Sequence, residues 1–200
     1  MKKRLSLLVL ALMMTLTACS GKYPDRAADG TAWDRDWTIL GTVLGVEDPG
    51  GGFELTENPV VLTGEDTHYA VWSLGEGEIV TNAAGKEATV YNAQLYFLLC
   101  GCRDGDYAMQ TVEAWMERQR AVYDITVTDE AACNSQTYTL LHYNTRSEDN
   151  PYARGVLAFA VAGRYAVSAE LTCRQNWVGD EAAVLTQFLN GCHWAANLEG

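Results

Sequence analysis

Basic residues are scarce in this sequence. Fourteen Lys and Arg residues stand against 26 Asp and Glu residues, which gives a net charge of −12 at pH 7. Residues 1–18 hold three of the basic residues and none of the acidic ones, so residues 19–200 carry a charge of −15. Such a domain does not neutralise phosphates, which argues against a nucleic-acid partner. The acidity is explained most simply by solubility; a cationic partner and weakly held Ca²⁺ are the alternatives.

The sequence also lacks an apolar run long enough to span a membrane. Its twelve-residue run, Leu5–Leu16, falls short of the about 20 residues that a hydrocarbon core requires. The run follows Met1-Lys2-Lys3-Arg4, and this order of charge and apolarity is typical of a secretory signal peptide.

The end of the predicted signal resembles the bacterial lipobox in Leu16-Thr17-Ala18-Cys19. The resemblance implies a signal peptide over residues 1–18, cleavage before Cys19 and a diacylglyceryl group on its sulfur. Two acyl chains anchor a protein stably, so the expected address is the extracytoplasmic face of the cell membrane. Ser20 follows the cysteine, and an aspartate there would resemble an inner-membrane retention signal. In a cell with two membranes, the outer one is therefore expected.

The polar stretch after the cysteine is predicted to be a tether. Ser20–Thr31 contains Gly and Pro and has no periodicity, so residues 19–32 are expected to hold the domain off the membrane. The remaining residues, 33–200, suit one globular domain in length.

Strand patterns dominate this domain. They cover residues 53–55, 60–62, 67–74, 78–81, 87–99, 124–128, 137–144, 155–161 and 165–173. Helical spacing predicts a central helix over 106–123, with Asp106 as N-cap, and a final helix after Asp180 whose apolar face reaches Cys192. The segment 37–46 is broken by two glycines and fits either class. The expected fold is α+β, a largely antiparallel sheet of meander and C-terminal hairpin with both helices packed on it.

This order of elements, over roughly residues 36–195, resembles the PsbP-like α/β/α sandwich. It also resembles small bacterial lipoproteins of similar size whose roles are not established. Because the PsbP-like family consists largely of accessory and binding proteins, the resemblance implies a binding role. It supplies no site residues.

Motifs for metal and catalysis are missing. The sequence contains no Cys-x-x-Cys, His-x-x-x-His, Gly-x-Ser-x-Gly or Ser-x-x-Lys, so no metal, cofactor or catalytic residue is predicted. The three histidines are His68, His142 and His193, and any of them could meet a serine or thiol in space. An envelope hydrolase or transferase therefore stays an alternative to a non-enzymatic module.

Five cysteines follow Cys19, and an odd number leaves at least one thiol free. Cys173 and Cys192 are both expected to point inward, from the last strand and the last helix. A disulfide between them would close a loop of about twenty residues and stabilise the domain by roughly 3 kcal/mol. Cys133 is the competing partner for either.

The last strand offers a candidate ligand face. Its outward residues are polar: Ser168, Glu170, Thr172 and Arg174, joined in the prediction by His142 and by Trp177 just beyond. Exposed aromatic residues among polar ones are typical of a glycan- or protein-binding surface. The alternatives are a solvent-facing strand with a Glu170–Arg174 pair and a tryptophan that packs a loop. The leading expectation is a binding or accessory module at the envelope, and a cell-wall or glycan-binding domain is the other alternative.

Overall fold

The computed structural model describes residues 27, 30–34, 36–41, 43–62, 66–81, 85–147, 150–195 and 198, without the side chains of 58–62. The predicted signal peptide, the lipobox and Cys19 lie outside the described residues. Across the described ranges, no helix is long and apolar enough to cross a membrane. Ala27, placed in the predicted tether, is buried and forms a β-bridge with Ala195, so the folded domain begins before Trp33.

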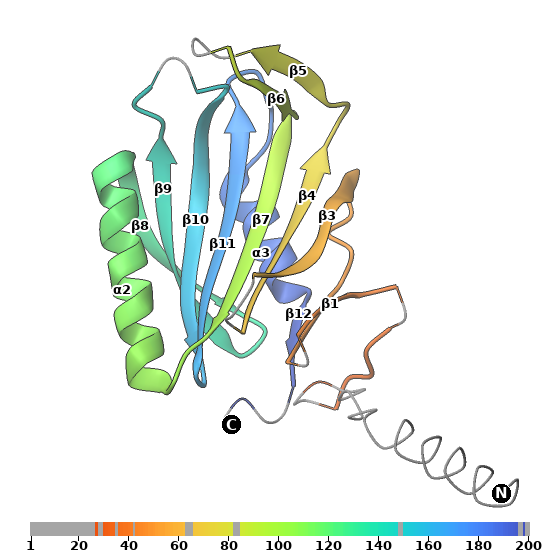
Figure 1. The fold of residues 1–200 in the computed structure, drawn as a ribbon, viewed down its shortest axis with the longest axis vertical. Helices are drawn as coiled ribbons and strands as arrows, with labels where there is room; N and C mark the ends of the chain where they lie inside the picture. Colours follow the sequence, from red (N-terminus) through yellow and green to blue (C-terminus); the bar gives the residue numbers. More distant parts are fainter. Residues whose placement is uncertain are drawn as a thin grey trace, which may run out of the picture.

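A seven-stranded antiparallel sheet forms the centre of the domain (Figure 1). Its order is β3-β4-β7-β11-β10-β9-β8. The strands are β3 (Phe53–Leu62), β4 (Thr67–Leu74), β7 (Ala93–Gly101), β8 (Asp124–Cys133), β9 (Gln136–Asn144), β10 (Tyr152–Ala162) and β11 (Tyr165–Arg174). The predicted α+β class is confirmed.

One face of the sheet packs on the C-terminal helix α3 (Glu181–Asn190), which lies behind the sheet in Figure 1. Asp180 is its N-cap, as predicted, and accepts a hydrogen bond from the Ala183 amide. The ring of Phe188 meets Trp72 and Phe97 edge-on, at centroid distances of 5.1 and 5.8 Å. These aromatic contacts fix the helix to β4 and β7.

A small second sheet, in the order β1-β2-β12, extends this layer. It consists of β1 (Thr38–Leu40), β2 (Leu44–Val46) and β12 (Cys192–Trp194). The ambiguous segment 37–46 is therefore a hairpin, and Gly41 has a positive φ of 59° at its turn. The His68 ring lies so close that a Cβ on Gly41 would be 2.8 Å from its Nε2. The prediction that Cys192 belongs to the last helix is wrong, because the helix ends at Asn190.

The other helix, α2 (Gly105–Val122), packs on the opposite face, over β10 and β11. Its buried residues, Ala108 and Val112, belong to a second core cluster with Leu157 and Phe159. Asp104 is the N-cap and accepts from the Tyr107 amide at 2.8 Å. The prediction of Asp106 was wrong by two residues, because Asp104 already supplies the oxygen that the first turn needs.

Some predicted strands are joined or divided differently in the structure, and β8 and β10 are longer than the predicted 124–128 and 155–161. The pieces 53–55 and 60–62 are one strand, β3, whose register shifts around Glu57. The long strand predicted over 87–99 is divided into β6 (Glu87–Val90), which pairs with β5 (Glu78–Thr81), and β7. The division is at Asn92, whose amide donates to Leu74 O and whose carbonyl accepts from Arg174 N, each at 3.0 Å. These long-range bonds turn the chain from one sheet into the other.

Candidate functional site: the tyrosine face

A row of four residues crosses the sheet on the face that α2 only partly covers. The strand register pairs Glu57 with Val71, Val71 with Tyr96, and Tyr96 with Glu170. Residues directly opposite one another in antiparallel strands share a face. The row continues as Leu157 and Leu141 into the core beneath α2. Val71 is buried, whereas Glu57, Tyr96 and Glu170 are at least partly exposed. We call these three residues, with their neighbours Tyr69, Tyr123 and Tyr143, the tyrosine face.

Glu170 is the partly buried acid of this face. The Tyr143 hydroxyl donates to its Oε1 at 2.6 Å, and the Tyr123 hydroxyl donates to the same oxygen at 3.5 Å. The two tyrosine rings stack at a centroid distance of 4.0 Å and an interplanar angle of 16°. Since Tyr123 follows α2 and Tyr143 belongs to β9, the stack joins helix and sheet beside the carboxylate.

The electrostatics follow from burial. Burial raises the pKa of Glu170, and the hydrogen bonds from Tyr143 and Tyr123 oppose that effect. Burial, with the charge of Glu170, raises the pKa of Tyr123 to about 12. Burial also raises the pKa of Tyr96 strongly, aided by Tyr152 and Glu170. The tyrosines therefore stay neutral hydrogen-bond donors at neutral pH.

At the far end of the row, Glu57 on β3 accepts a hydrogen bond from the Tyr69 hydroxyl of β4. Burial, this bond and the carboxylate charge raise the pKa of Tyr69 to about 12. Glu57 is exposed, so water can reach this end of the face.

A network of neutral polar groups lies beside the row. Gln94 donates through Nε2 to Ser73 Oγ at 3.0 Å and accepts at Oε1 from the hydroxyls of Tyr96, at 2.8 Å, and Tyr152. Ser73 is also 2.8 Å from Thr56 Oγ1. A pocket of about 480 Å³, lined in part by Thr56, Ser73 and Tyr91, opens at this network. The tyrosine face is thus continuous with a hollow at the β4–β5 turn.

Gly155 makes room for the buried tyrosine. A Cβ at this position of β10 would be 2.3 Å from Leu171 O and 2.6 Å from Tyr143 Oη. The Tyr143 ring therefore occupies the volume that any larger residue would need. No sequence pattern marked this glycine.

The predicted ligand face is only partly brought together. Ser168, Glu170, Thr172 and Arg174 alternate with the core residues of β11, as expected, but Thr172 is buried. Arg174 pairs with Glu78 of β5 at 2.8 Å, so the predicted alternative of a Glu170–Arg174 pair is not found.

His142 and Trp177 do not join this face. His142 is opposite Val156, a residue of the core on the α3 side, and its Nε2 is 3.5 Å from Asp129 Oδ2 at the sheet edge. Trp177 packs against the same core, and its carbonyl accepts from Arg154 Nη2 at 2.9 Å. For His142 the reason is the two-residue period of strands, which places it on the opposite side of β9 from Tyr143.

Each histidine faces a carboxylate, and the three lie apart. His68 Nε2 is 3.0 Å from Asp66 Oδ1, and His193 Nε2 is 2.7 Å from Glu47 Oε1. The other ring nitrogen of His193 is 3.3 Å from Asn134 Nδ2, and Trp37 stacks on the ring at 4.5 Å. Both nitrogens of His193 thus have partners, which suits a structural role. Within the described ranges, no group of three metal-ligating side chains occurs.

Cys173 and Cys192 are both free and buried, contrary to the predicted disulfide. Cys173 belongs to β11 and lies close to the ion pair between Arg154 of β10 and Glu181, the first residue of α3. Cys192 follows the end of that helix. A ten-residue helix is about 15 Å long, whereas a disulfide needs Cα atoms within about 7 Å. Burial raises the pKa of Cys173 to about 12, which makes it a poor nucleophile.

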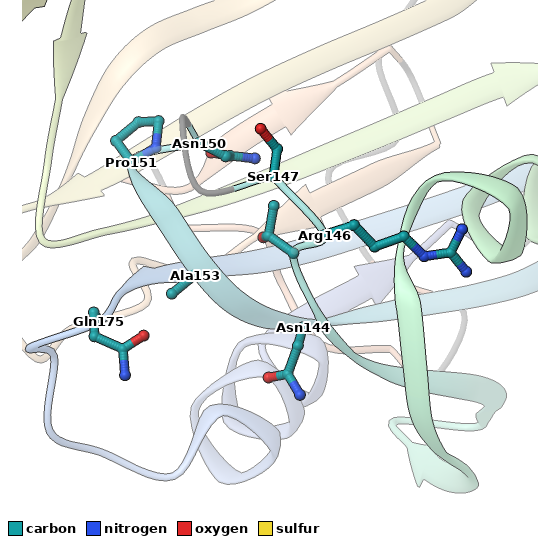
Figure 2. A pocket seen from close by; sticks show the side chains of 8 residues that line it. Asn144, Arg146, Ser147, Asn150, Pro151, Ala153 and Gln175 are labelled. Atoms are coloured by element: carbon teal, nitrogen blue, oxygen red, sulfur yellow. The ribbon is translucent and has the colours of Figure 1, made fainter.

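Two further pockets lie away from the tyrosine face. One, of about 430 Å³, is at the β9–β10 turn, where Figure 2 shows Arg146 extending away from Asn144 and Gln175. The Arg146 guanidinium donates hydrogen bonds to the carbonyls of Ala121 and Arg120, at 3.0 and 3.4 Å, and so caps the C-terminal end of α2. The other, of about 420 Å³, is beside Cys102 and holds Arg164, which pairs with Asp66 at 2.8 Å. The arginine of each pocket, Arg146 or Arg164, therefore already forms contacts within the fold.

Comparison with known proteins gives a fold resemblance. No protein family and no curated protein sequence matches the chain. Six chains of solved structure match it. One is cyanobacterial PsbP (CyanoP) from Synechocystis sp. PCC 6803, in solution. It is 9% identical, with a TM-score of 0.39, over 74% of this chain and 98% of that chain.

Proposed function

We propose that this protein is a lipid-anchored, non-enzymatic binding or accessory module of the cell envelope, and that its ligand binds on the tyrosine face. The lipobox residues Leu16-Thr17-Ala18-Cys19 support the anchor on the Cys19 sulfur and the extracytoplasmic address. In a cell with two membranes, the outer membrane is the proposed site, because Ser20 follows the cysteine.

The observation that carries the proposal is the partly buried Glu170 on a sheet face that remains accessible. A fold has no structural need to desolvate a carboxylate there, because an apolar residue would extend the core cluster of Leu157 and Phe159. Tyr123 and Tyr143 hold the carboxylate in one orientation. Groups held in this way, beside aromatic rings, suit recognition of a ligand.

A binding role is supported further by the positions of the histidines and by the raised pKa values of the buried thiols. His68 and His193 each contact a carboxylate, at 3.0 and 2.7 Å and in different parts of the fold, and burial raises the pKa of the Cys173 and Cys192 thiols. General base catalysis needs a base beside the reacting group, and these residues do not gather at the tyrosine face.

The test is capture from envelope extract on the full chain, purified in a mild non-ionic detergent and immobilised through its N-terminus. Bound proteins, glycans and small molecules are read by mass spectrometry. Tyr96→Ser alters the centre of the face, and Tyr107→Ser alters an exposed tyrosine of α2 as a matched control.

The proposal predicts a component that the wild type and the Tyr107 variant retain and the Tyr96 variant loses. Equal capture by all three would contradict it. Turnover of a glycan or peptide in the extract would instead favour the hydrolase or transferase alternative. A retained cell-wall glycan lost from a Trp177→Ala variant alone would favour the glycan-binding alternative.

A further inference from the structure

The tyrosine face carries carboxylates at both ends and an aromatic ring between them. Glu57 and Glu170 are separated by three strand intervals in the register Glu57–Val71–Tyr96–Glu170. At about 4.8 Å per interval, their backbones lie about 14 Å apart. Both charges act on Tyr96, since each contributes to raising its pKa, so the two acids flank this ring.

Glu170 is partly buried and Glu57 is exposed, but both carboxylates can accept further hydrogen bonds. Both tyrosine hydroxyls bound to Glu170 use Oε1, and among the described residues no donor is bound to Oε2. Glu57 is exposed and receives one hydrogen bond, from Tyr69. A carboxylate has about four acceptor positions, so each can accept N–H groups of a ligand.

The cation nearest to this face along β11 is already engaged. Arg174, four residues after Glu170, pairs with Glu78 at 2.8 Å. A ligand cation would therefore meet two carboxylates and the faces of neutral tyrosine rings, which attract cations. The net charge of −12 favours approach of a cation over the whole surface.

We propose that the tyrosine face binds a linear polyamine, with one ammonium group at Glu170, the other end at Glu57 and the chain across Tyr96. The assignment rests on the proposed binding function and names its ligand class. Alkyl ammonium groups supply the charge and the N–H donors that the carboxylates accept. The flexible methylene chain between the ammonium groups matches the Tyr96 ring; Val71, in the same row, is buried and is not part of the contact surface.

The experiment is calorimetric titration of spermidine into the full chain in mild detergent at low ionic strength and near-neutral pH. Three variants each remove one negative charge: Glu170→Gln, Glu57→Gln and, as control, Glu130→Gln at an exposed position of β8. Circular dichroism melting checks that each is folded. n-Butylamine, a monocation, tests whether both ends are used.

We expect one spermidine per chain, with affinity lowered about tenfold by Glu170→Gln and severalfold by Glu57→Gln, as for loss of a close charge pair. The Glu130 control should change it less than about twofold, since long-range charge alone is screened, and butylamine should bind at least about tenfold more weakly. No binding to the wild type, or equal weakening by all three variants, would overturn the assignment. If spermidine fails while the Tyr96 variant still loses a captured component, the ligand class is wrong and the binding function stands.

Discussion

The Tyr143 hydroxyl donates a hydrogen bond of 2.6 Å to Glu170 Oε1. Tyr143 belongs to β9 and Glu170 to β11, and β10 lies between these strands. This bond joins β9 to β11 across β10, at the position where β10 has Gly155. It is the contact that most strongly orients the candidate ligand-binding acid.

Removing this donor should cost stability. Tyr143→Phe leaves Glu170 with the longer bond from Tyr123, at 3.5 Å. A hydrogen bond to a charged group contributes about 1.5–3 kcal/mol, so the free energy of unfolding should fall by about 2 kcal/mol in urea titrations at neutral pH. Tyr107→Phe, at an exposed tyrosine, is the control. Equal stability of the two variants would show that the bond carries no net energy.

Glu170 should make stability depend on pH. Its pKa is raised above 4.5 in the folded state, so its stabilising contribution is complete below about pH 4.5 and is lost as pH rises through the folded pKa. Glu170→Gln has no ionisable group at this position, so it does not lose stability as the pH rises through the pKa of Glu170. The variant's unfolding free energy relative to wild type should therefore rise with pH above about 4.5 and then level off. A difference that stays flat, or falls with pH, would contradict a raised pKa; Glu130→Gln is the charge-matched control.

Gly155 should not tolerate a methyl group. The Cβ of Gly155→Ala would be 2.3 Å from the backbone oxygen of Leu171, which cannot move without opening the β10–β11 pairing. Overpacking of this kind costs about 1–3 kcal/mol or more, seen as a lower melting temperature. The same clash displaces Tyr143, so binding at Glu170 should weaken too. Gly85→Ala is the comparison variant, because its added Cβ meets no neighbouring atom and tests only the cost of a positive φ. Unchanged stability of Gly155→Ala would contradict the close packing around Gly155.

Cys173 and Cys192 should both be alkylated when the chain is unfolded without reductant. In the native domain both should resist alkylation, because they are buried and their thiol pKa values are raised. Peptide mapping after iodoacetamide treatment shows which of the two cysteines is labelled in the native, the unfolded and the reduced chain. Labelling of this pair only after reduction would restore the disulfide predicted from the sequence.

Local patterns were sufficient for much of the fold. The alternation in β11 and the helical spacing of α2 and α3 identified these elements within a few residues, because the apolar residues follow the period of each element. The break at Asn92 was missed because long-range backbone bonds cause it. The pairing of Cys173 with Cys192 failed for a related reason: both point inward, but α3 lies between them.

The candidate site was found only in part. Glu170 was identified because it is polar on a strand whose other face is apolar. Tyr96, Tyr123 and Tyr143 were missed, since a tyrosine in a strand pattern looks the same whether its hydroxyl meets water or a buried acid. His142 was wrongly included, because its side of β9 depends on register with β10, which the sequence does not specify.

Hydroxyl-radical footprinting tests the central claim, that the tyrosine face is where the ligand binds, most directly. Oxidation of the full chain is compared between intact cells and the purified protein, at Tyr96 and Met116 near the face and at exposed Tyr107 and Met109 of α2. The account predicts protection of Tyr96 and Met116 in cells, with Tyr107 and Met109 unchanged. Equal oxidation of Tyr96 in both settings, or protection confined to Tyr107 and Met109, would contradict it.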